Sequence, residues 1–178
     1  MGRMGVRLAR PGDEMEVARV HVRSWRAAYW DLLDRSMLAR MRPESRARRY
    51  DFATRSPTRP RTLVATEDGA IVGFATVSPS HDPDVPGWGE LNALYVDPDT
   101  WGTGVGRALI AAARERLKTQ GFQDAVLWVL EGNAKAERFY RRDGWIFDDL
   151  HRRERMWGMW VDELRYRRAL DLPAGITS

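Results

Sequence analysis

The 178-residue chain contains no cysteine, which excludes disulfide bonds, a thiolate nucleophile and cysteine-type zinc sites. It has no stretch approaching ~18 consecutive apolar residues, and its N-terminus lacks the apolar segment of a secretory signal. We therefore expect a soluble, cytoplasmic protein with no membrane partner. A chain of this length favours one domain with a substantial core.

Lysine is also scarce, because only two of the 29 basic residues are lysine and the others are arginine. Arginine suits phosphate-rich ligands, since its guanidinium group can donate two parallel hydrogen bonds. A surplus this general can equally reflect genome base composition. The net charge of +4 is spread along the chain, which is weak support for a nucleic-acid-binding module, and we expect no nucleic-acid partner.

What the chain does have is a glycine loop between an apolar strand and a helix. The strand covers residues 90–96, the loop carries Gly102, Gly104 and Gly106, and an apolar helical run follows from Arg107. Glycine lets the backbone turn tightly and leaves no Cβ in the way of a ligand. The helix that follows offers unpaired N–H groups and the positive end of its dipole. Together these features predict a cradle for a phosphate or pyrophosphate.

The spacing of the loop excludes two common nucleotide sites. A P-loop needs Lys-Ser/Thr after its last glycine, whereas Arg107-Ala108 stands here. A dinucleotide fingerprint needs Gly-x-Gly-x-x-Gly directly after the strand, whereas here the pattern is Gly-x-Gly-x-Gly and residues 98–101 intervene. The acidic residue of that fingerprint should end the next strand, but Asp124 precedes it.

A second motif follows downstream, and it reads Asn133-Ala-Lys-Ala-Glu-Arg-Phe-Tyr140-Arg-Arg-Asp-Gly144-Trp145. The ordered pair resembles the GNAT superfamily of N-acetyltransferases, whose loop reads Arg/Gln-x-x-Gly-x-Gly/Ala. The family's second motif reads Asn-x-x-Ala-x-x-Phe-Tyr-x-x-x-Gly-Phe/Trp, and this chain matches it at every named position. The loop departs once, because Trp101 stands where Arg or Gln is usual. The resemblance is specific over residues 60–148 and looser toward both ends.

The resemblance implies an α/β fold with a mixed, mostly antiparallel sheet of about seven strands and helices on both faces. Such sheets splay between the fourth and fifth strands, here residues 90–96 and 125–130, and the pantetheine arm of the cofactor lies in the splay. One domain over residues 1–178 would comprise a cofactor-binding core (60–148), N-terminal helices bordering the acceptor site (13–54) and C-terminal strands (145–170).

Local patterns place the remaining elements. Asp13 and Glu16 form a capping box that predicts a helix start, and Pro43 predicts the start of a short helix to about residue 53. Asp68-Gly69 predicts a tight hairpin, and Gly121 the end of the helix at 104–120. The last strands are expected at residues 145–147 and 161–167. The segment from Arg152 to Val161 is interpreted as a dimer contact or a flap over the acceptor site.

Acetyl-CoA is the co-substrate that the resemblance implies. Its pyrophosphate would be bound by backbone N–H groups of the loop and helix start: Gly102, Thr103, Gly104, Val105, Gly106 and Arg107. Backbone groups of Leu94, Tyr95 and Val96 would pair with pantetheine as an added strand pairs with a sheet edge. Asn133 would contact the CoA arm, although it also serves simply as a helix N-cap. His21 and His151 have no partner at ligand spacing, so no metal is expected.

Tyr140 is the predicted general acid, because a departing CoA thiolate needs a proton and a tyrosine with a reference pKa of ~10 holds one at neutral pH. From sequence alone a core aromatic is the simpler reading, and the full motif favours the functional one. Glu90 is the predicted base for the amine proton, with a solvent-exposed strand end as the alternative. His81, Asp82 and Asp84 are fallback bases.

Trp25, Tyr29 and Trp30 lie on or just after the first predicted helix, which borders the acceptor pocket in many small-molecule members of the superfamily. An aromatic stripe at helical spacing is more usually core. If these rings line a pocket, they favour an acceptor with an apolar or cationic part.

The resulting hypothesis is an N-acetyltransferase that moves an acetyl group from acetyl-CoA to a primary amine of a small molecule. The amine attacks directly in a ternary complex, with no covalent enzyme intermediate. Three alternatives stay open: a protein or peptide N-acetyltransferase, a non-catalytic acyl-CoA-binding regulator, and an arginine-based nucleic-acid-binding module. A homodimer also stays open.

Overall fold

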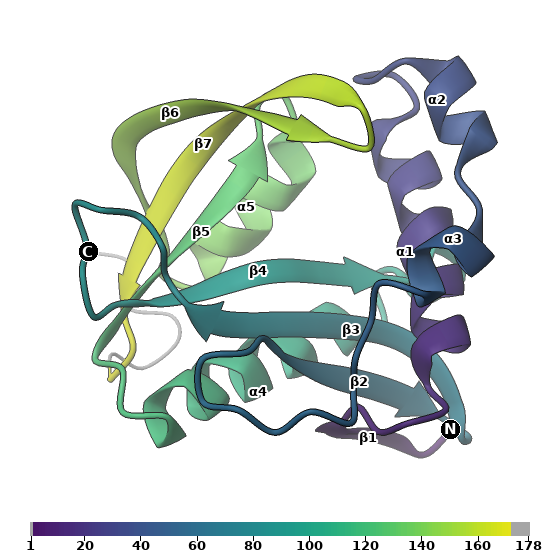
Figure 1. Ribbon diagram of the computed structural model, residues 1–178, viewed down its shortest axis with the longest axis horizontal. Coiled ribbons are helices and arrows are strands. Elements are labelled where there is room, and N and C mark those ends of the chain that lie inside the picture. Colours follow the sequence, from purple (N-terminus) through teal and green to yellow (C-terminus); the bar gives the residue numbers. More distant parts are fainter. Residues whose placement is uncertain (1, 172–178) are drawn as a thin grey trace.

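The computed structural model describes residues 2–171, and one seven-stranded sheet runs through them (Figure 1). The strand order is β1-β2-β3-β4-β5-β7-β6, and neighbours are antiparallel except for the parallel pair β4 and β5. The strands are β1 (Met4–Leu8), β2 (Arg61–Glu67), β3 (Ala70–Pro79), β4 (Gly89–Val96), β5 (Asp124–Leu130), β6 (Ile146–Met156) and β7 (Met159–Ala169). The mixed, mostly antiparallel sheet predicted from the sequence is confirmed.

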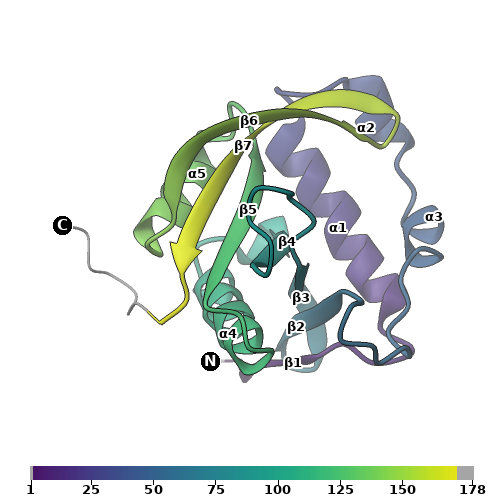
Figure 2. The ribbon, with the colours of Figure 1, turned by 60° about the vertical axis from the view of Figure 1, so that its left-hand side comes forward.

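Helices cover both faces of this sheet, as predicted (Figure 2). One face carries α1 (Glu14–Tyr29), α2 (Arg35–Arg40) and α3 (Pro43–Ala47), and the other carries α4 (Val105–Thr119) and α5 (Ala134–Arg142). A one-turn 3₁₀ helix, η1 (Pro98–Thr100), follows β4. The main core lies between the sheet and α4, whose Leu109 and Leu117 are fully buried. Within residues 2–171, no helix combines the length and apolarity needed to cross a membrane.

The predicted splay between β4 and β5 is confirmed. The two strands pair only over residues 89–91 of β4 and 125–127 of β5, and the pairing stops there although both strands continue. Beyond that point β4 pairs with β3 alone, so its other edge is a row of backbone groups without a strand partner. This unpaired edge is where the sequence places the pantetheine arm.

Three local signals in the sequence are confirmed by the backbone. Asp68 and Gly69 have φ angles of 50° and 87°, as both central residues of a tight hairpin turn require. Gly121 has a φ of 94° and ends α4, with its N–H donating to the Lys118 carbonyl at 2.9 Å. The Asn133 side chain caps α5 by accepting a hydrogen bond from the Ala136 N–H at 3.2 Å.

The first helix, α1, begins at Glu14 as predicted, but two other predictions at the N-terminal helices are wrong. Asp13 does not cap α1 with its side chain. Its carboxylate instead accepts hydrogen bonds from the Arg7 guanidinium at 2.7 Å and from the Arg10 N–H at 2.9 Å. Glu16 likewise reaches across to the Ile71 N–H at 3.3 Å instead of closing a capping box. The third helix ends at Ala47 rather than near residue 53. At Asp13 and Glu16 these tertiary contacts override a local signal. Beyond Ala47 the chain is not helical, and Tyr50 and Phe52 pack against the buried cluster that contains Val17 and Phe74.

The C-terminal strands are much longer than predicted. β6 and β7 each span 11 residues and form a hairpin that turns at Trp157 and Gly158, whose φ angles are 52° and 79°. The segment from Arg152 to Val161, interpreted as a flap or dimer contact, is the end of this hairpin. The hairpin tip arches toward α2 (Figures 1 and 2). The centres of the Trp157 ring and of the Trp25 ring on α1 lie 6.0 Å apart. The extra length of β6 was missed because its exposed residues are mostly charged, and these hide the alternation of apolar and polar residues that marks a strand.

Candidate active site

The glycine loop has the geometry of an anion cradle. Gly102 and Gly104 have φ angles of 78° and 94°, which disfavour any residue with a side chain. A Cβ built on either glycine meets no atom within 4 Å, so the space above the loop is open. The first helical hydrogen bond of α4 runs from the Ala108 N–H to the Gly104 carbonyl at 3.0 Å. The N–H groups of Val105, Gly106 and Arg107 have no partner in the helix and are available to a phosphate, whereas that of Thr103 donates to the Thr100 carbonyl at 3.4 Å.

The first three residues of α4 differ in which of their groups can contact a ligand. Val105 is 2% exposed and buries its side chain in the core, so only its backbone N–H can meet a ligand. A Cβ on Gly106 would lie 3.3 Å from the Phe139 ring, so this glycine lets α4 approach α5 closely. Arg107 is exposed, and among the described residues its side chain forms no ion pair. Thr103 donates its hydroxyl to the Thr100 carbonyl at 2.6 Å, which holds the loop.

The hydrogen bonds of β4 show which of the three predicted pantetheine-binding residues face the unpaired edge. The Asp97 N–H donates to the Val72 carbonyl of β3 at 2.8 Å. Because successive residues of a strand point their N–H and C=O groups to opposite edges, those of Tyr95 also face β3, while those of Leu94 and Val96 face the splay. A backbone contact with pantetheine is therefore open to Leu94 and Val96 but not to Tyr95.

Trp101, the one departure from the family's loop pattern, contacts the same edge. Its indole N–H donates to the Val96 carbonyl at 2.8 Å, so this carbonyl has a protein partner in the structure. The ammonium group of Lys135, from the first turn of α5, lies 3.4 Å from the centre of the Trp101 ring. Trp101 thus connects the loop before α4 to the start of α5, a contact that the motif comparison did not reveal.

Tyr140 lies on α5 among aromatic rings, 5.4 Å from Phe139 and 6.5 Å from Trp145. Burial raises the pKa of Tyr140 well above its ordinary value, and the nearby Tyr95 adds to the shift. The hydroxyl therefore keeps its proton at neutral pH, as a general acid must. The position of α5 is held by a buried pair, in which Asp143 at its C-terminus accepts from Arg114 of α4 at 2.9 Å.

Tyr29, the last residue of α1, packs against Tyr95 of β4. Burial raises the pKa of Tyr29, Tyr140 adds to the shift, and hydrogen bonding to Tyr95 and Asn133 opposes it. The buried Tyr29 on α1 therefore meets the half-buried Tyr95 on β4 and Asn133 before α5, beside Tyr140. The structure brings together these four residues, which the sequence had assigned to separate tasks.

Glu90 lies near the start of β4 and is half-buried. Burial raises its pKa to about 7; Asp82 and Glu163 raise it as well, whereas Arg152 and a hydrogen bond from Asn92 lower it. A carboxylate with this pKa can accept a proton near neutral pH and release it again. Glu90 shares its strand with the Leu94 and Val96 backbone groups, so one element carries both the predicted base and the cofactor edge.

The other aromatic candidates differ in accessibility. Trp25 is 1% exposed and packs against Tyr29 with ring centres 4.8 Å apart, so it supports the wall of the site from within the core. Trp30 is 42% exposed and has the Arg35 guanidinium 5.4 Å from its ring. Their contact with an acceptor stays a prediction. His21 is buried, and its Nδ1 lies 2.7 Å from the Tyr50 hydroxyl.

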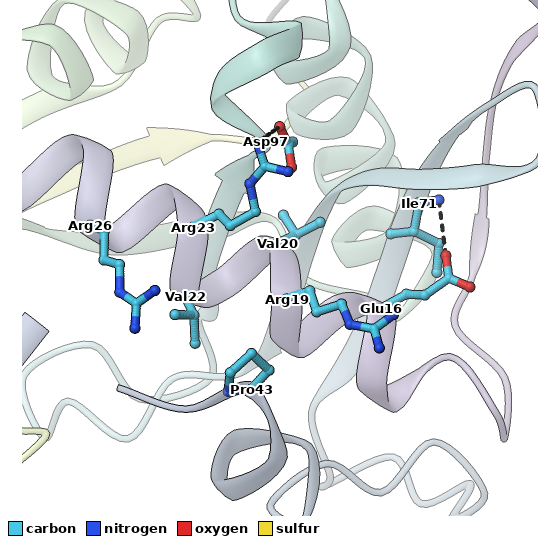
Figure 3. Close-up of a pocket in the computed structure, with 9 residues that line it drawn as sticks. All are labelled: Glu16, Arg19, Val20, Val22, Arg23, Arg26, Pro43, Ile71 and Asp97. Atoms are coloured by element: carbon cyan, nitrogen blue, oxygen red, sulfur yellow. Dashed lines mark hydrogen bonds and ion pairs between the residues drawn. The ribbon is translucent and has the colours of Figure 1, made fainter. Parts of the chain in front are cut away.

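A surface hollow of about 410 Å³ on the outer side of α1 lies apart from these residues (Figure 3). Two of its arginines already have partners within the protein. Arg23 forms an ion pair with Asp97 at 3.3 Å, and Arg26 donates to the Leu38 carbonyl at 2.9 Å. The hollow includes neither Glu90 nor Tyr140. Within residues 2–171, no group of three or more His, Asp or Glu residues is placed to hold a metal ion.

Comparison with known proteins agrees with this geometry. The sequence profile of the acetyltransferase (GNAT) family matches residues 22–145. YuaI of Bacillus subtilis (strain 168), described as an uncharacterized N-acetyltransferase, is 31% identical over 129 residues, which are 72% of each chain. The chain belongs to the GNAT family of acetyltransferases. It is therefore an acyltransferase that uses acetyl-CoA, and the open glycine cradle and the unpaired edge of β4 fit that co-substrate.

Two further similar proteins differ in the share of their length that this chain covers. Mycothiol acetyltransferase of Thermobispora bispora is 35% identical over 97 residues, which are 51% of this chain but only 32% of that longer protein. The yncA structure from Salmonella typhimurium, solved with its cofactor acetyl-CoA, superposes with a TM-score of 0.65 at 21% identity. It covers 99% of both chains and so shares the whole fold.

Glu163, Arg152 and Arg165 are charged residues near the site that the sequence interpretation missed. Glu163 is 6% exposed and lies in the strand predicted at residues 161–167, but the sequence interpretation assigned it no role. The signal was present in the alternation of β7, because Glu163 and Arg165 share a face with the buried Val161. A charged residue on the inward face of a strand needs a partner or a function.

Proposed function

We propose that this GNAT enzyme acetylates a primary amine of a small molecule. The observation that carries the proposal is the arrangement of β4, whose unpaired edge at Leu94 and Val96 borders the splay and whose start holds the half-buried Glu90. Tyr140 of α5 and its N-cap residue Asn133, which follow β5 in the chain, complete the site from the other side of the splay. The base and the acid are thereby carried by elements on opposite sides of it.

The residues have complementary tasks in the transfer. Acetyl-CoA supplies an activated acetyl group as a thioester. Glu90 accepts a proton from the amine, directly or through one water, as the amine nitrogen forms its bond to the acetyl carbon. The carbon–sulfur bond breaks, and Tyr140 donates its proton to the departing sulfur. N–H groups of Leu94 and Val96 are the backbone donors available to stabilise charge on the acetyl oxygen. The products are an acetamide and the free CoA thiol.

The surroundings of Glu90 favour a small acceptor over a protein chain. The loop before β4 is held down because Asp82 and Asp84 both pair with Arg165 of β7, at 3.1 and 2.6 Å. The tip of the β6–β7 hairpin packs on α1 through Trp157. These contacts fix the loop before β4 and the tip of the β6–β7 hairpin, the two segments that flank the proposed acceptor site. The relatives named for mycothiol rather than for a protein support the same proposal.

The test is release of the CoA thiol from acetyl-CoA in the presence of small primary amines and, separately, of peptides with free N-termini. We expect the kcat/KM for at least one small amine to exceed that for every peptide. A higher kcat/KM for peptides would favour a protein N-acetyltransferase. Binding of acetyl-CoA without thiol release from any acceptor would favour a non-catalytic regulator.

Glu90 should give the reaction a pH dependence. A base acts in its ionised form, so kcat/KM should rise with pH through about 7, the pKa to which burial raises Glu90. We expect Glu90→Gln to lower kcat/KM and to remove this acidic limb, measured with the same amine so that the amine's own ionisation is unchanged. The groups facing Glu90 are Asp82, Glu163, Arg152 and Asn92. An acidic limb retained in Glu90→Gln would show that another group is the base.

A further inference from the structure

Asn92 is an extra residue in β4 that interrupts the pairing of this strand with β3. Ala93 and Leu91 lie opposite two consecutive residues of β3, so Asn92 between them has no partner residue there. The pairing of β4 with β5 also ends at Leu91. Such a β-bulge turns the strand about its own axis and redirects the side chains next to it. Asn92 therefore lies at the point where the splay opens.

The bulge decides which face of the sheet Glu90 occupies. In a regular strand alternate residues share a face, so Leu91 and Ala93 should pack on the same side. Instead Leu91 lies in the core beneath α4, and Ala93 packs against the cluster on the α1 side that contains Val17. Glu90, next to Leu91, therefore faces the α1 side. If Asn92 were paired regularly and Ala93 kept its place, the Glu90 carboxylate would point into the core beneath α4.

The Asn92 side chain contacts Glu90 directly. Its Nδ2 atom donates a hydrogen bond to the Glu90 Oε2 atom at 2.5 Å. An ionised carboxylate only accepts hydrogen bonds, so the amide nitrogen of Asn92 must be the atom that faces it. The charged groups that face Glu90 are Asp82, Glu163 and Arg152. Within residues 2–171 none of these three forms a hydrogen bond with Glu90, so Asn92 is the residue that orients its carboxylate.

We propose that Asn92 is a positioning residue for the proton transfer, which holds one oxygen of Glu90 and thereby directs the other at the amine. The inference rests on the proposed function, in which Glu90 accepts the amine proton. Because Oε2 is bound to Asn92, Oε1 is the oxygen that takes the proton as the amine nitrogen forms its bond to the acetyl carbon. The Asn92 side chain is exposed, so its amide is needed as a donor and not for packing.

Asn92→Leu removes the donor and keeps nearly the same side-chain size. We expect kcat/KM for CoA release to fall about five-fold or more, the effect of one hydrogen bond to a charged group. The acidic limb of kcat/KM should also move to higher pH, because loss of a donor to the ionised carboxylate raises the pKa of Glu90 above about 7. Asn92→Gln keeps an amide and should restore most of the activity. A purely structural role of Asn92 would lower the melting temperature and leave the acidic limb in place.

A double-mutant cycle decides whether Asn92 acts through Glu90. In the Glu90→Gln background, Asn92→Leu should change kcat/KM by less than about two-fold, because the group that it positions is already absent. Equal losses in both backgrounds would overturn the inference alone. Titration of the Glu90 carboxyl carbon by NMR, assigned by its loss in Glu90→Gln, needs no acceptor, and an unchanged pKa of Glu90 in Asn92→Leu would also overturn it. No CoA release with any amine would contradict the proposed function instead.

Discussion

Tyr140→Phe should lower kcat about ten-fold or more while leaving the affinity for acetyl-CoA nearly unchanged. The substitution removes one oxygen from a ring that is held by Phe139 and Trp145, so the packing of α5 is kept. What is lost is a proton donor, and the departing thiolate must then take its proton from water. The measurement is steady-state CoA release, with acetyl-CoA affinity from calorimetry.

Tyr166→Phe is the matched control for this prediction. Tyr166 is fully buried, its pKa is raised to about 12, and its hydroxyl donates to Glu137 at 2.6 Å. Loss of this hydroxyl removes a buried hydrogen bond, which should lower stability by ~1 kcal/mol without a comparable loss of kcat. Equal effects of the two substitutions on kcat would show that Tyr140 contributes only to packing.

Gly104→Ala should weaken acetyl-CoA binding about ten-fold or more, which corresponds to ~1.4 kcal/mol or more. The φ angle of 94° is unfavourable for alanine, and the added methyl group projects into the open space above the cradle. No protein atom lies within 4 Å of that position, so the methyl group meets no neighbour inside the protein. A loss of affinity therefore reports on the space that the phosphate occupies.

Gly69→Ala separates backbone strain from loss of the ligand site. Gly69 has a φ of 87° and equally open surroundings, but it lies in the β2–β3 turn. Both variants should lose ~1–2 kcal/mol of stability from the left-handed conformation. Only Gly104→Ala should raise the dissociation constant of acetyl-CoA in calorimetry. Unchanged affinity in Gly104→Ala would place the pyrophosphate elsewhere.

The features that the sequence predicted well depend on glycine or on a short motif. Gly104 and Gly121 require left-handed backbone at one position, so their turns can be inferred without knowledge of the rest of the fold. Asn133 caps α5 through a residue only three positions later in the sequence, so the cap can be inferred locally. The splay between β4 and β5 was predicted because the family resemblance supplied the strand order, which no local pattern contains.

The features that the sequence missed depend on contacts between distant segments. Asp13 looked like a helix cap, yet Arg7 on β1 takes its carboxylate. Glu163 was assigned no role from the sequence, yet the partner strand brings Arg152 to 2.7 Å from its carboxylate and the side chain is buried. Tyr95 was assigned a backbone role that depends on which edge of β4 is paired. Each outcome is set by tertiary pairing, which a single sequence does not display.

The central claim is that acetyl-CoA lies in the splay, between the cradle of α4 and the unpaired edge of β4, because every proposed role depends on it. Hydrogen–deuterium exchange with and without acetyl-CoA tests this claim most directly. We predict slower exchange in peptides that cover residues 92–107 and 131–140, with little change in β1 and β2. Protection confined to other segments, such as the hollow on the outer side of α1, would contradict the account.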